Sequence, residues 1–494
     1  MKYTPGFYLL LLMLMSSCNK YLEKEPDNRA KLTDPAKVSQ LLASAYPLGN
    51  YMPFAEAMSD NAGDKGSGEA DVTNSAPYAF ENVPNSEQDS PDYYWHACYT
   101  AIASANQALE ACNQAANPDD YQSQKGEALV ARAYAHFMLV TLYAKPYDPA
   151  TAASNPGIPY VTEPETVVNK QYSRGTVADV YQNIESDLTE GLPLLDDASY
   201  KVPRYHFTRS AANAFAARFY LYKKDYDKAV QYANTAVPDL LPNLRPWNTR
   251  YQTYGINNLP AEYQKTTEPA NLLLVTCPSS YTYGLLFIRY RYGLTPSIKN
   301  EIFDTPLGVT GGDWAYITGY VGSQKNPGVP KLNYTDFEAS DPSSNFGLPY
   351  GTVCLLTTED VLFNKAEANV YLGNYDAAIQ DLNTFLSTRL TGVTPGALPA
   401  NRTITQTKVR QHYNNAYNIQ EALIRYILEL RRLEFVHEGM RWMDMLRYGL
   451  TVTHDFVGAG GVVTNSITID PDSKLRQLKL PDGVKLSGIT DLNR

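Results

Sequence analysis

The longest amphipathic pattern in the chain runs from residue 421 to residue 449. Its apolar positions recur at steps of three or four, which places them in one stripe along an α-helix. The stripe consists of Leu423, Ile427, Leu430, Leu433, Val436, Met440, Met443 and Leu446. No Pro or Gly interrupts it before Gly439, and Gly449 is placed to end it. The pattern predicts one long helix over 421–449 that packs on a large partner surface.

Charged residues flank this stripe on both sides. They are Arg431, Arg432, Glu434, Glu438, Arg441, Asp444 and Arg447. From Glu438 onwards their signs alternate at a spacing of three residues, which lets neighbours pair along a helix. We interpret the flank as a solvated face with ion pairs rather than as a chemical site.

Five further segments show helical periodicity and can supply the partner surface: 32–46, 91–116, 123–143, 176–195 and 208–222. The pattern is clearest in 123–143, where Ala128, Ala131 and Ala135 lie on one face with larger apolar residues. Small residues at these positions let two helices approach closely. We therefore expect a body of tightly packed helices.

Two segments of the chain repeat each other. Residues 219–230 (FYLYKKDYDKAV) and 369–379 (NVYLGNYDAAI) both read as a helix, a tight turn followed by Tyr, and a second helix that carries Ala. This is the organisation of tetratricopeptide-like helix pairs. The sequence therefore predicts a mainly α fold, an α/α superhelix of degenerate helix pairs with long loop-rich insertions.

Several stretches lack helical periodicity. Residues 58–90 predict a long surface loop, and 391–418 a second irregular segment. Residues 238–351 are rich in Pro, Gly, Asn and Tyr, with strand-like runs at 271–276 and 285–290. The tail after Val457 looks β-like.

The N-terminus is typical of an exported lipoprotein. Lys2 precedes a short apolar run over 7–15, too short to span a bilayer, and LMSSC at 14–18 is similar to a bacterial lipobox. We expect Cys18 to be lipidated and to anchor the protein; an ordinary secreted protein with an incidental Cys18 is the alternative. The other cysteines, Cys98, Cys112, Cys277 and Cys354, form no C-x-x-C motif, which favours buried free thiols.

Composition and charge narrow the functional classes. The net charge is −10 and no Lys/Arg run is present, so we expect no nucleic-acid partner. The chain carries none of the common hydrolase, metalloprotease or phosphate-loop motifs, and we expect no catalytic residue and no cofactor. A carboxylate pair for glycoside hydrolysis is not readable from sequence. The loop carboxylates Asp60 and Asp64 miss the spacing of a calcium-binding EF-hand, and no metal site is predicted.

Several motifs together resemble the SusD/RagB family of surface lipoproteins that serve nutrient uptake in Bacteroidetes. Residues 431–447 (RRLEFVHEGMRWMDMLR) are similar to the family's ERRLEL…EGxRWxDLxR run, although Leu430 replaces the usual Glu. Residues 95–106 (WHACYTAIASAN), 127–134 (EALVARAY) and 366–368 (AEA) resemble three further helices of the family in the expected order. The usual closing pattern of the family is missing from the tail.

The resemblance implies an organisation and a partner. It implies a signal peptide at 1–17, a lipidated tether at 18–30 and a single domain at 31–494. Within that domain it implies a helical body at 31–237 and 356–450 and a loop-rich, ligand-side insertion at 238–355. The implied role is capture of oligosaccharides at the outer membrane, facing the exterior, for a SusC-like TonB-dependent transporter. Peptide capture and a scaffold that binds no ligand are the alternatives.

A sugar-binding surface needs flat aromatic faces for the C–H side of the ring, and amides or carboxylates for its hydroxyls. The candidates are Trp247, Tyr283, Tyr292 and Trp314 from the insertion, with Asp60, Asn61 and Asp64 from the first loop. For each aromatic the alternative is packing that holds a long loop against the body. Trp95 and Trp442 lie on helical stripes, and we expect both in the core.

Overall fold

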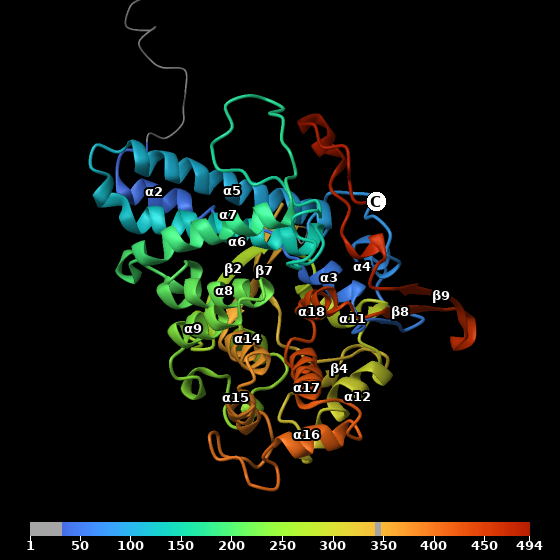
Figure 1. Ribbon diagram of the computed structural model, residues 1–494. Coiled ribbons are helices and arrows are strands. Elements are labelled where there is room, and N and C mark those ends of the chain that lie inside the picture. Colours follow the sequence, from blue (N-terminus) through green and yellow to red (C-terminus); the bar gives the residue numbers. More distant parts are fainter. Residues whose placement is uncertain (1–31, 341–346) are drawn as a thin grey trace, which may run out of the picture.

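The computed structural model describes residues 32–340 and 347–494, and the predicted signal peptide, Cys18 and tether lie outside them. As the sequence predicts, the described chain is mainly helical (Figure 1). Within these residues, none of the helices combines the length and apolar character needed to cross a membrane.

The N-terminal part is a layer of helices at the top of Figure 1. Its elements are α2 (Pro35–Leu42), α5 (Pro91–Gln114), α6 (Gln122–Tyr143) and α7 (Val177–Gly191). The short helices α3 (Met52–Met58) and α4 (Val72–Tyr78) pack on each other and lie lower, at the right of Figure 1. Helix α6 packs on both α5 and α7 and is buried along nearly its whole length. The predicted small face of α6 is confirmed, because Ala128, Ala131 and Ala135 are all buried.

The two repeated segments form two helix hairpins, as predicted. They are α8 (Arg209–Tyr222) with α9 (Tyr226–Ala236), and α14 (Thr358–Tyr371) with α15 (Tyr375–Ser387). Lys224 (φ 65°) and Gly373 (φ 79°) supply the left-handed turn residues. Helix α9 packs on α14, where Tyr226 and Tyr371 stack with ring centroids 4.4 Å apart. The paired hairpins are consistent with tetratricopeptide-like organisation.

The insertion contains a three-stranded antiparallel sheet in the order β2 (Asn271–Pro278), β7 (Gly347–Thr357), β6 (Tyr334–Ala339). This confirms the strand predicted at 271–276. The strand predicted at 285–290 is wrong, because Gly284 (φ 56°) and Leu285 (φ 59°) adopt left-handed conformations that break an extended run. That segment forms a short helix, α11 (Leu286–Arg289), instead.

Short elements complete the insertion and the C-terminal part. They are α10 (Leu259–Tyr263), β3 (Tyr292–Gly293), α12 (Pro296–Asp304), α13 (Leu307–Thr310), β4 (Gly319–Tyr320), β5 (Pro327–Gly328) and α16 (Gln406–His412). The tail forms a hairpin of β8 (Val452–Val457) and β9 (Val463–Ile469), which projects from the body in Figure 1. Beyond it the chain returns to the helices, where the Leu478 N–H donates to the Leu142 carbonyl at 3.1 Å.

The first long loop is more ordered and more buried than its composition suggested. It contains α4 and a short strand, β1 (Gly63–Asp64), which pairs with β3. The Asp71 carboxylate caps α4 by accepting from the Thr73 N–H at 2.8 Å. Asn61 and Tyr78 are almost fully buried. The expectation of a surface loop over 58–90 therefore holds only in part: residues 66–70 and most of 81–87 are exposed, whereas Asn61 and most of α4 are buried.

The long helical pattern forms two helices, α17 (Ile419–Glu434) and α18 (Met440–Tyr448), rather than one. His437 (φ 73°) and Gly439 (φ 71°) turn the chain between them. The Glu56 carboxylate on α3 accepts from both N–H groups, at 2.9 Å and 3.0 Å, so the break leaves neither donor unsatisfied. A Cβ on Gly439 would lie 3.0 Å from the Met52 Cα, which explains the glycine. The apolar stripe itself is buried as predicted.

The charged flank of this pattern is buried, contrary to the expectation of a solvated face. Arg431, Glu434, Glu438 and Asp444 are each no more than 2% exposed. They are covered by α14 and by the insertion. The periodicity of 421–449 cannot show which other segments of the chain pack on this face. Because an unpaired buried charge is costly, each of these groups is held by at least one partner of opposite sign.

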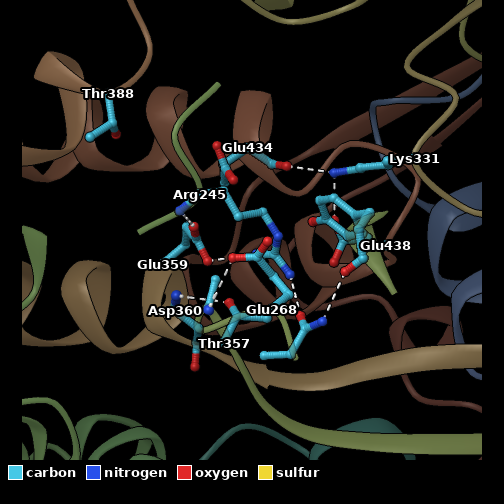
Figure 2. Close-up of polar contacts among 12 residues, drawn as sticks. Arg245, Glu268, Lys331, Thr357, Glu359, Asp360, Thr388, Glu434 and Glu438 are labelled. Carbon is cyan, nitrogen blue, oxygen red and sulfur yellow. Dashed lines mark hydrogen bonds and ion pairs between the residues drawn. The ribbon is translucent and has the colours of Figure 1, made fainter. Parts of the chain in front are cut away.

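One buried network joins the insertion to the helices (Figure 2). Arg389, just after α15, contacts Glu359 on α14 and Glu434 on α17, each at 3.0 Å. From the insertion, Arg245 pairs with Glu359 at 2.6 Å and Lys331 with Glu438 at 2.5 Å. Burial alone would raise the pKa of Glu434, but the Arg389 guanidinium outweighs it and lowers the pKa. The network holds the insertion against α14 and α17.

A second buried network joins four helices. Arg431 on α17 binds Asp444 on α18 at 2.8 Å and Asp360 on α14 at 3.4 Å. Asp360 in turn binds Arg218 on α8 at 3.0 Å. Asp444 and Asp360 thus link the C-terminal helices α17 and α18 to α14 and to α8 of the first hairpin.

We expect Glu434→Gln to destabilise the protein by about 3–5 kcal/mol, because it leaves the buried Arg389 short of a counter-charge. Glu421→Gln on the same helix is the matched control. Its partner Arg425 is 46% exposed, so the loss should stay below about 1 kcal/mol. Urea denaturation of the two variants measures both values, and equal losses would contradict a special role for the buried pair.

Candidate functional site

Three aromatic side chains, two of them exposed and one half-buried, gather at one edge of the insertion. Tyr283, Tyr334 and Phe337 form this surface aromatic cluster. Tyr283 and Tyr334 are 43% and 42% exposed, unusually high for tyrosines. The ring of Tyr283 lies 5.1 Å from that of Tyr334 and 5.9 Å from that of Phe337, centroid to centroid. Such a group offers several aromatic faces to a ligand.

The cluster is built by two neighbouring elements. Tyr283 lies just before α11, and Tyr334 and Phe337 lie on the edge strand β6. Pairing of β6 with β7 fixes their register, with Tyr334 opposite Gly351 and Phe337 opposite Pro349. The same strand carries the exposed carboxylates Asp336 and Glu338. They alternate with Phe337 and therefore point to the opposite face of the strand, where Glu338 accepts from the Tyr350 hydroxyl at 2.8 Å.

A buried anchor holds the segment that carries Tyr283. Asp89 accepts from the Ser279 hydroxyl at 2.6 Å and from the N–H groups of Ser280 and Tyr281 at 2.8 and 3.1 Å. The Tyr281 hydroxyl donates to the His437 carbonyl at 2.9 Å. Two residues further on, Tyr283 points into solvent on a fixed backbone. The anchor reduces the entropy that a flexible loop loses on binding.

Two buried charges lie along this segment. Burial raises the pKa of Asp89 to about 7, despite three hydrogen bonds that favour its carboxylate. On the far side of α11, the Lys65 ammonium donates to the Ile288 carbonyl at 2.8 Å, and burial lowers the pKa of Lys65 to about 7. Both groups change charge near neutral pH in the folded protein.

Of the aromatic candidates from the sequence, Tyr283 alone belongs to the cluster. The assignment of Trp247 to the ligand surface is corrected. Its side chain is 1% exposed and packs against Tyr251 and Tyr316, with ring centroids 5.1 and 4.8 Å away. The ring therefore holds an irregular segment in the core and presents no face to a ligand. Trp95 and Trp442 are buried as expected.

Trp314 and Tyr292 are half-buried and also pack loops. The Trp314 indole N–H donates to the Phe303 carbonyl at 2.7 Å. Tyr292 stacks on Tyr78 with a centroid distance of 4.3 Å. Among the ring contacts of the described residues, none joins either side chain to Tyr283. The contacts of both side chains therefore agree with the alternative that each holds a loop against the body.

The polar candidates of the first loop are occupied by partners within the chain. Asp60 accepts two hydrogen bonds from Arg441, both at 2.8 Å, and Asp64 two from Arg291, both at 2.8 Å. Burial alone would raise the pKa of Asp60, but Arg441 outweighs it and lowers the pKa. Asn61 is buried and accepts from Arg432 at 2.9 Å. These residues tie distant segments together. The assignment of Asn61 and Asp64 to a ligand surface is corrected, because their side chains are buried. The Asp60 side chain is paired but 27% exposed.

Asp60 lies at the wall of a hollow of about 640 Å³ between α12, α16, α17 and α18. Its charged groups are mutually paired, because Arg441 binds Asp60 and Arg432 binds Glu301. Among the described residues, no group of three or more His, Cys, Asp or Glu side chains is arranged to hold a metal ion.

Sequence reasoning missed Tyr334 and Phe337. Both lie in a stretch of mixed polarity, and only the pairing of β6 with β7 turns their rings towards Tyr283. Their alternation with Asp336 and Glu338 was the one signal present in the sequence.

Known proteins match both halves of the chain. Residues 20–221 match a family described as SusD-like, "Starch-binding associating with outer membrane", and residues 358–476 match the SusD family. A SusD-like protein of Formosa agariphila is 23% identical over 89% of this chain and 90% of its own length.

Solved structures share the fold. A putative sugar binding protein from Bacteroides vulgatus aligns over 93% of this chain and 97% of its own, with a TM-score of 0.66 and 18% identity. A SusD-like carbohydrate binding protein from the same organism aligns over 92% and 96%, with a TM-score of 0.64 and 17% identity. A laminarin binding SusD-like protein aligns over 84% and 92%, with a TM-score of 0.56 and 18% identity.

The buried Lys65 predicts a pH dependence of stability. With its pKa lowered from 10.5 to about 7, the unfolded chain binds the extra proton between these values, so the free energy of unfolding rises with pH there. The slope contributed is at most about 1.4 kcal/mol per pH unit. Lys65→Met should remove this rise between pH 7 and 10 in urea denaturation.

Lys485→Met, at a lysine whose side chain is 55% exposed, is the control and should leave the rise in place. An unchanged slope in Lys65→Met would contradict the assignment. Asp89 acts in the opposite sense below pH 7: with its pKa raised from 3.8 to about 7, the folded protein binds the extra proton and stability falls as pH rises.

The family matches cover the helical body on either side of the insertion, the described relatives span nearly the whole chain, and the helical architecture agrees with both. The chain belongs to the SusD/RagB family.

Proposed function

We propose that the protein captures oligosaccharides at the outer membrane and delivers them to a SusC-like TonB-dependent transporter. The observation that carries this proposal is the surface aromatic cluster of Tyr283, Tyr334 and Phe337 in a chain of this family. The exposed aromatic faces suit the C–H side of a sugar ring. The role is binding, and no chemical step is assigned.

The related proteins support a glycan more than a peptide. Sugar or carbohydrate binding is stated for the two Bacteroides vulgatus structures, and laminarin binding for a third. Peptide capture is the second candidate, since the same family includes the RagB branch. A glycan of several units would span neighbouring rings of the cluster, whereas a peptide would pair with the free edge of β6.

We expect Tyr283→Ala and Tyr334→Ala each to weaken glycan binding about tenfold, because one stacked aromatic contributes roughly 0.5–1.5 kcal/mol beyond its buried area. Isothermal titration with laminarin and with soluble starch measures the change. Stability should move by no more than about 0.5 kcal/mol, since both side chains are exposed.

Tyr320→Ala is the matched control, because Tyr320 is 49% exposed and lies outside the cluster. It should bind as the unaltered protein does. Trp247→Ala should instead lower stability by about 3–5 kcal/mol. Binding of a tryptic peptide mixture, lost in Tyr283→Ala and without any glycan binding, would favour the peptide alternative. Glycan binding that survives both tyrosine variants would contradict the site.

The lipid anchor is proposed at Cys18. We expect Cys18→Ala to release the protein from the membrane fraction and to abolish palmitate labelling, because several acyl chains on one cysteine are what makes anchoring stable. Fractionation of cells that express each form measures this. Cys98→Ala, at a buried thiol, is the control and should stay in the membrane fraction. Retention of Cys18→Ala would contradict the anchor.

A further inference from the structure

The carboxylate of Asp89 is unusual among the buried acids of this protein. Apart from Asp89 and Glu56, every buried Asp or Glu side chain in the described chain pairs with an Arg, Lys or His. Asp89 is 2% exposed and accepts only from uncharged donors, the Ser279 hydroxyl and two backbone N–H groups. Burial raises its pKa to about 7, and the Asp71 carboxylate adds to the rise. A carboxyl group buried at this cost indicates a role in function rather than in stability.

Two successive hydrogen bonds link Asp89 to the backbone of Tyr283. The Ser280 N–H donates to the Asp89 carboxylate at 2.8 Å, and the Ser280 carbonyl accepts from the Tyr283 N–H at 3.0 Å. The Asp89 carboxylate therefore fixes the short turn from which the exposed Tyr283 ring extends.

The same segment is tied to the sheet that carries the other rings of the surface aromatic cluster. The Ser279 N–H donates to the Pro349 carbonyl on β7 at 2.9 Å, and Pro349 lies directly opposite Phe337 on β6. The Ser279 hydroxyl donates to Asp89 at 2.6 Å and accepts from the Asn50 amide at 3.0 Å. Asp89 thus acts at the point where the Tyr283 segment is aligned with β6 and β7.

The backbone on both sides of this contact favours an external hold. Gly284 (φ 56°) and Leu285 (φ 59°) directly follow Tyr283 in left-handed conformations, which a leucine adopts only where the surroundings fix it. Asp89 itself has a φ of 69°, a conformation that Asp and Asn tolerate better than most residues. The next residue, Ser90, caps α5 by accepting from the Tyr93 N–H at 3.1 Å, so the carboxylate is presented from a fixed helix end.

We propose that Asp89 is the positioning residue of the surface aromatic cluster, whose carboxylate keeps Tyr283 facing Tyr334 and Phe337 and thereby sets the affinity for glycan. The residue is buried and acts through Tyr283 rather than by touching the ligand. The inference rests on the function proposed above and adds to it the residue that prepares the site before binding.

A double-mutant cycle between Asp89 and Tyr283 tests the proposal. Asp89→Asn keeps the size of the side chain and tolerates its backbone conformation, but it replaces one acceptor oxygen by an N–H donor that faces other donors. Titration calorimetry with laminarin and with soluble starch should show binding weakened about three- to tenfold, the effect of losing one preordered side chain. The variant that carries both Asp89→Asn and Tyr283→Ala should bind no more weakly than Tyr283→Ala alone, because both changes remove the same contact. Losses that simply add would overturn the proposal.

Asp187→Asn is the matched control. Asp187 on α7 is also a buried carboxylate, but it pairs with Arg132 at 2.7 Å and shares no hydrogen bond with the 279–283 segment. Its loss leaves a buried arginine unpaired, so the melting temperature should fall further than in Asp89→Asn while glycan affinity stays unchanged. Equal losses of affinity in the two variants would show a general loosening of the fold and would overturn the positioning role.

Hydrogen exchange without any glycan gives a second, independent reading. In Asp89→Asn the backbone amides of Ser280 and Tyr281 should exchange about tenfold faster, because their acceptor is lost, whereas Asp187→Asn should leave them as they are. Unchanged exchange in Asp89→Asn, or glycan binding that this variant keeps in full, would overturn the positioning role alone. If the unaltered protein binds neither glycan, the proposed function fails and this inference fails with it, so the two failures are distinguishable.

Discussion

The ion pairs of Arg389 with Glu359 and Glu434 lie where three parts of the chain meet. Arg245 and Lys331 bring the insertion to the same place by binding Glu359 and Glu438. All of these groups are shut off from water, so none can exchange its partner for solvent at low cost. The position of the loop-rich insertion relative to the helices is therefore tied to one set of charge contacts.

Charge contacts of this kind select one arrangement of the packed elements more than they add to the net stability of the fold. Removing an arginine and a carboxylate from water costs several kcal/mol for each ion, and their attraction only repays it when every donor finds a partner. An apolar interface of the same area would tolerate sliding, whereas Arg389 accepts one arrangement of α14 and α17. We infer that this precision keeps Tyr283 and β6 in register on the outside of the insertion.

Much of the helical architecture follows from periodicity, because apolar spacing reports directly on which face of a helix is buried. The stripe from Leu423 to Leu446 and the Ala face of α6 were predicted on that basis, and both are buried. The burial of Arg431 and Glu434 was not predictable, because it depends on which other segments of the chain cover the helix. The same limit separates Trp247 from Tyr283, two aromatics in one irregular segment. Trp247 is covered by Tyr316, 69 residues further along, and no local pattern carries that information.

The Glu56 carboxylate, which satisfies the backbone between α17 and α18, has a consequence for the order in which the molecule folds. It receives the N–H of Gly439 across a separation of 383 residues. Glu56 also accepts from the nearby Asn61 amide at 3.1 Å, but its contact with Gly439 cannot form until the chain has been made as far as that residue. Contacts of such long range slow folding, because the loop must close before the contact is gained. The joint between α3 and the turn that separates α17 from α18 thus forms late in folding.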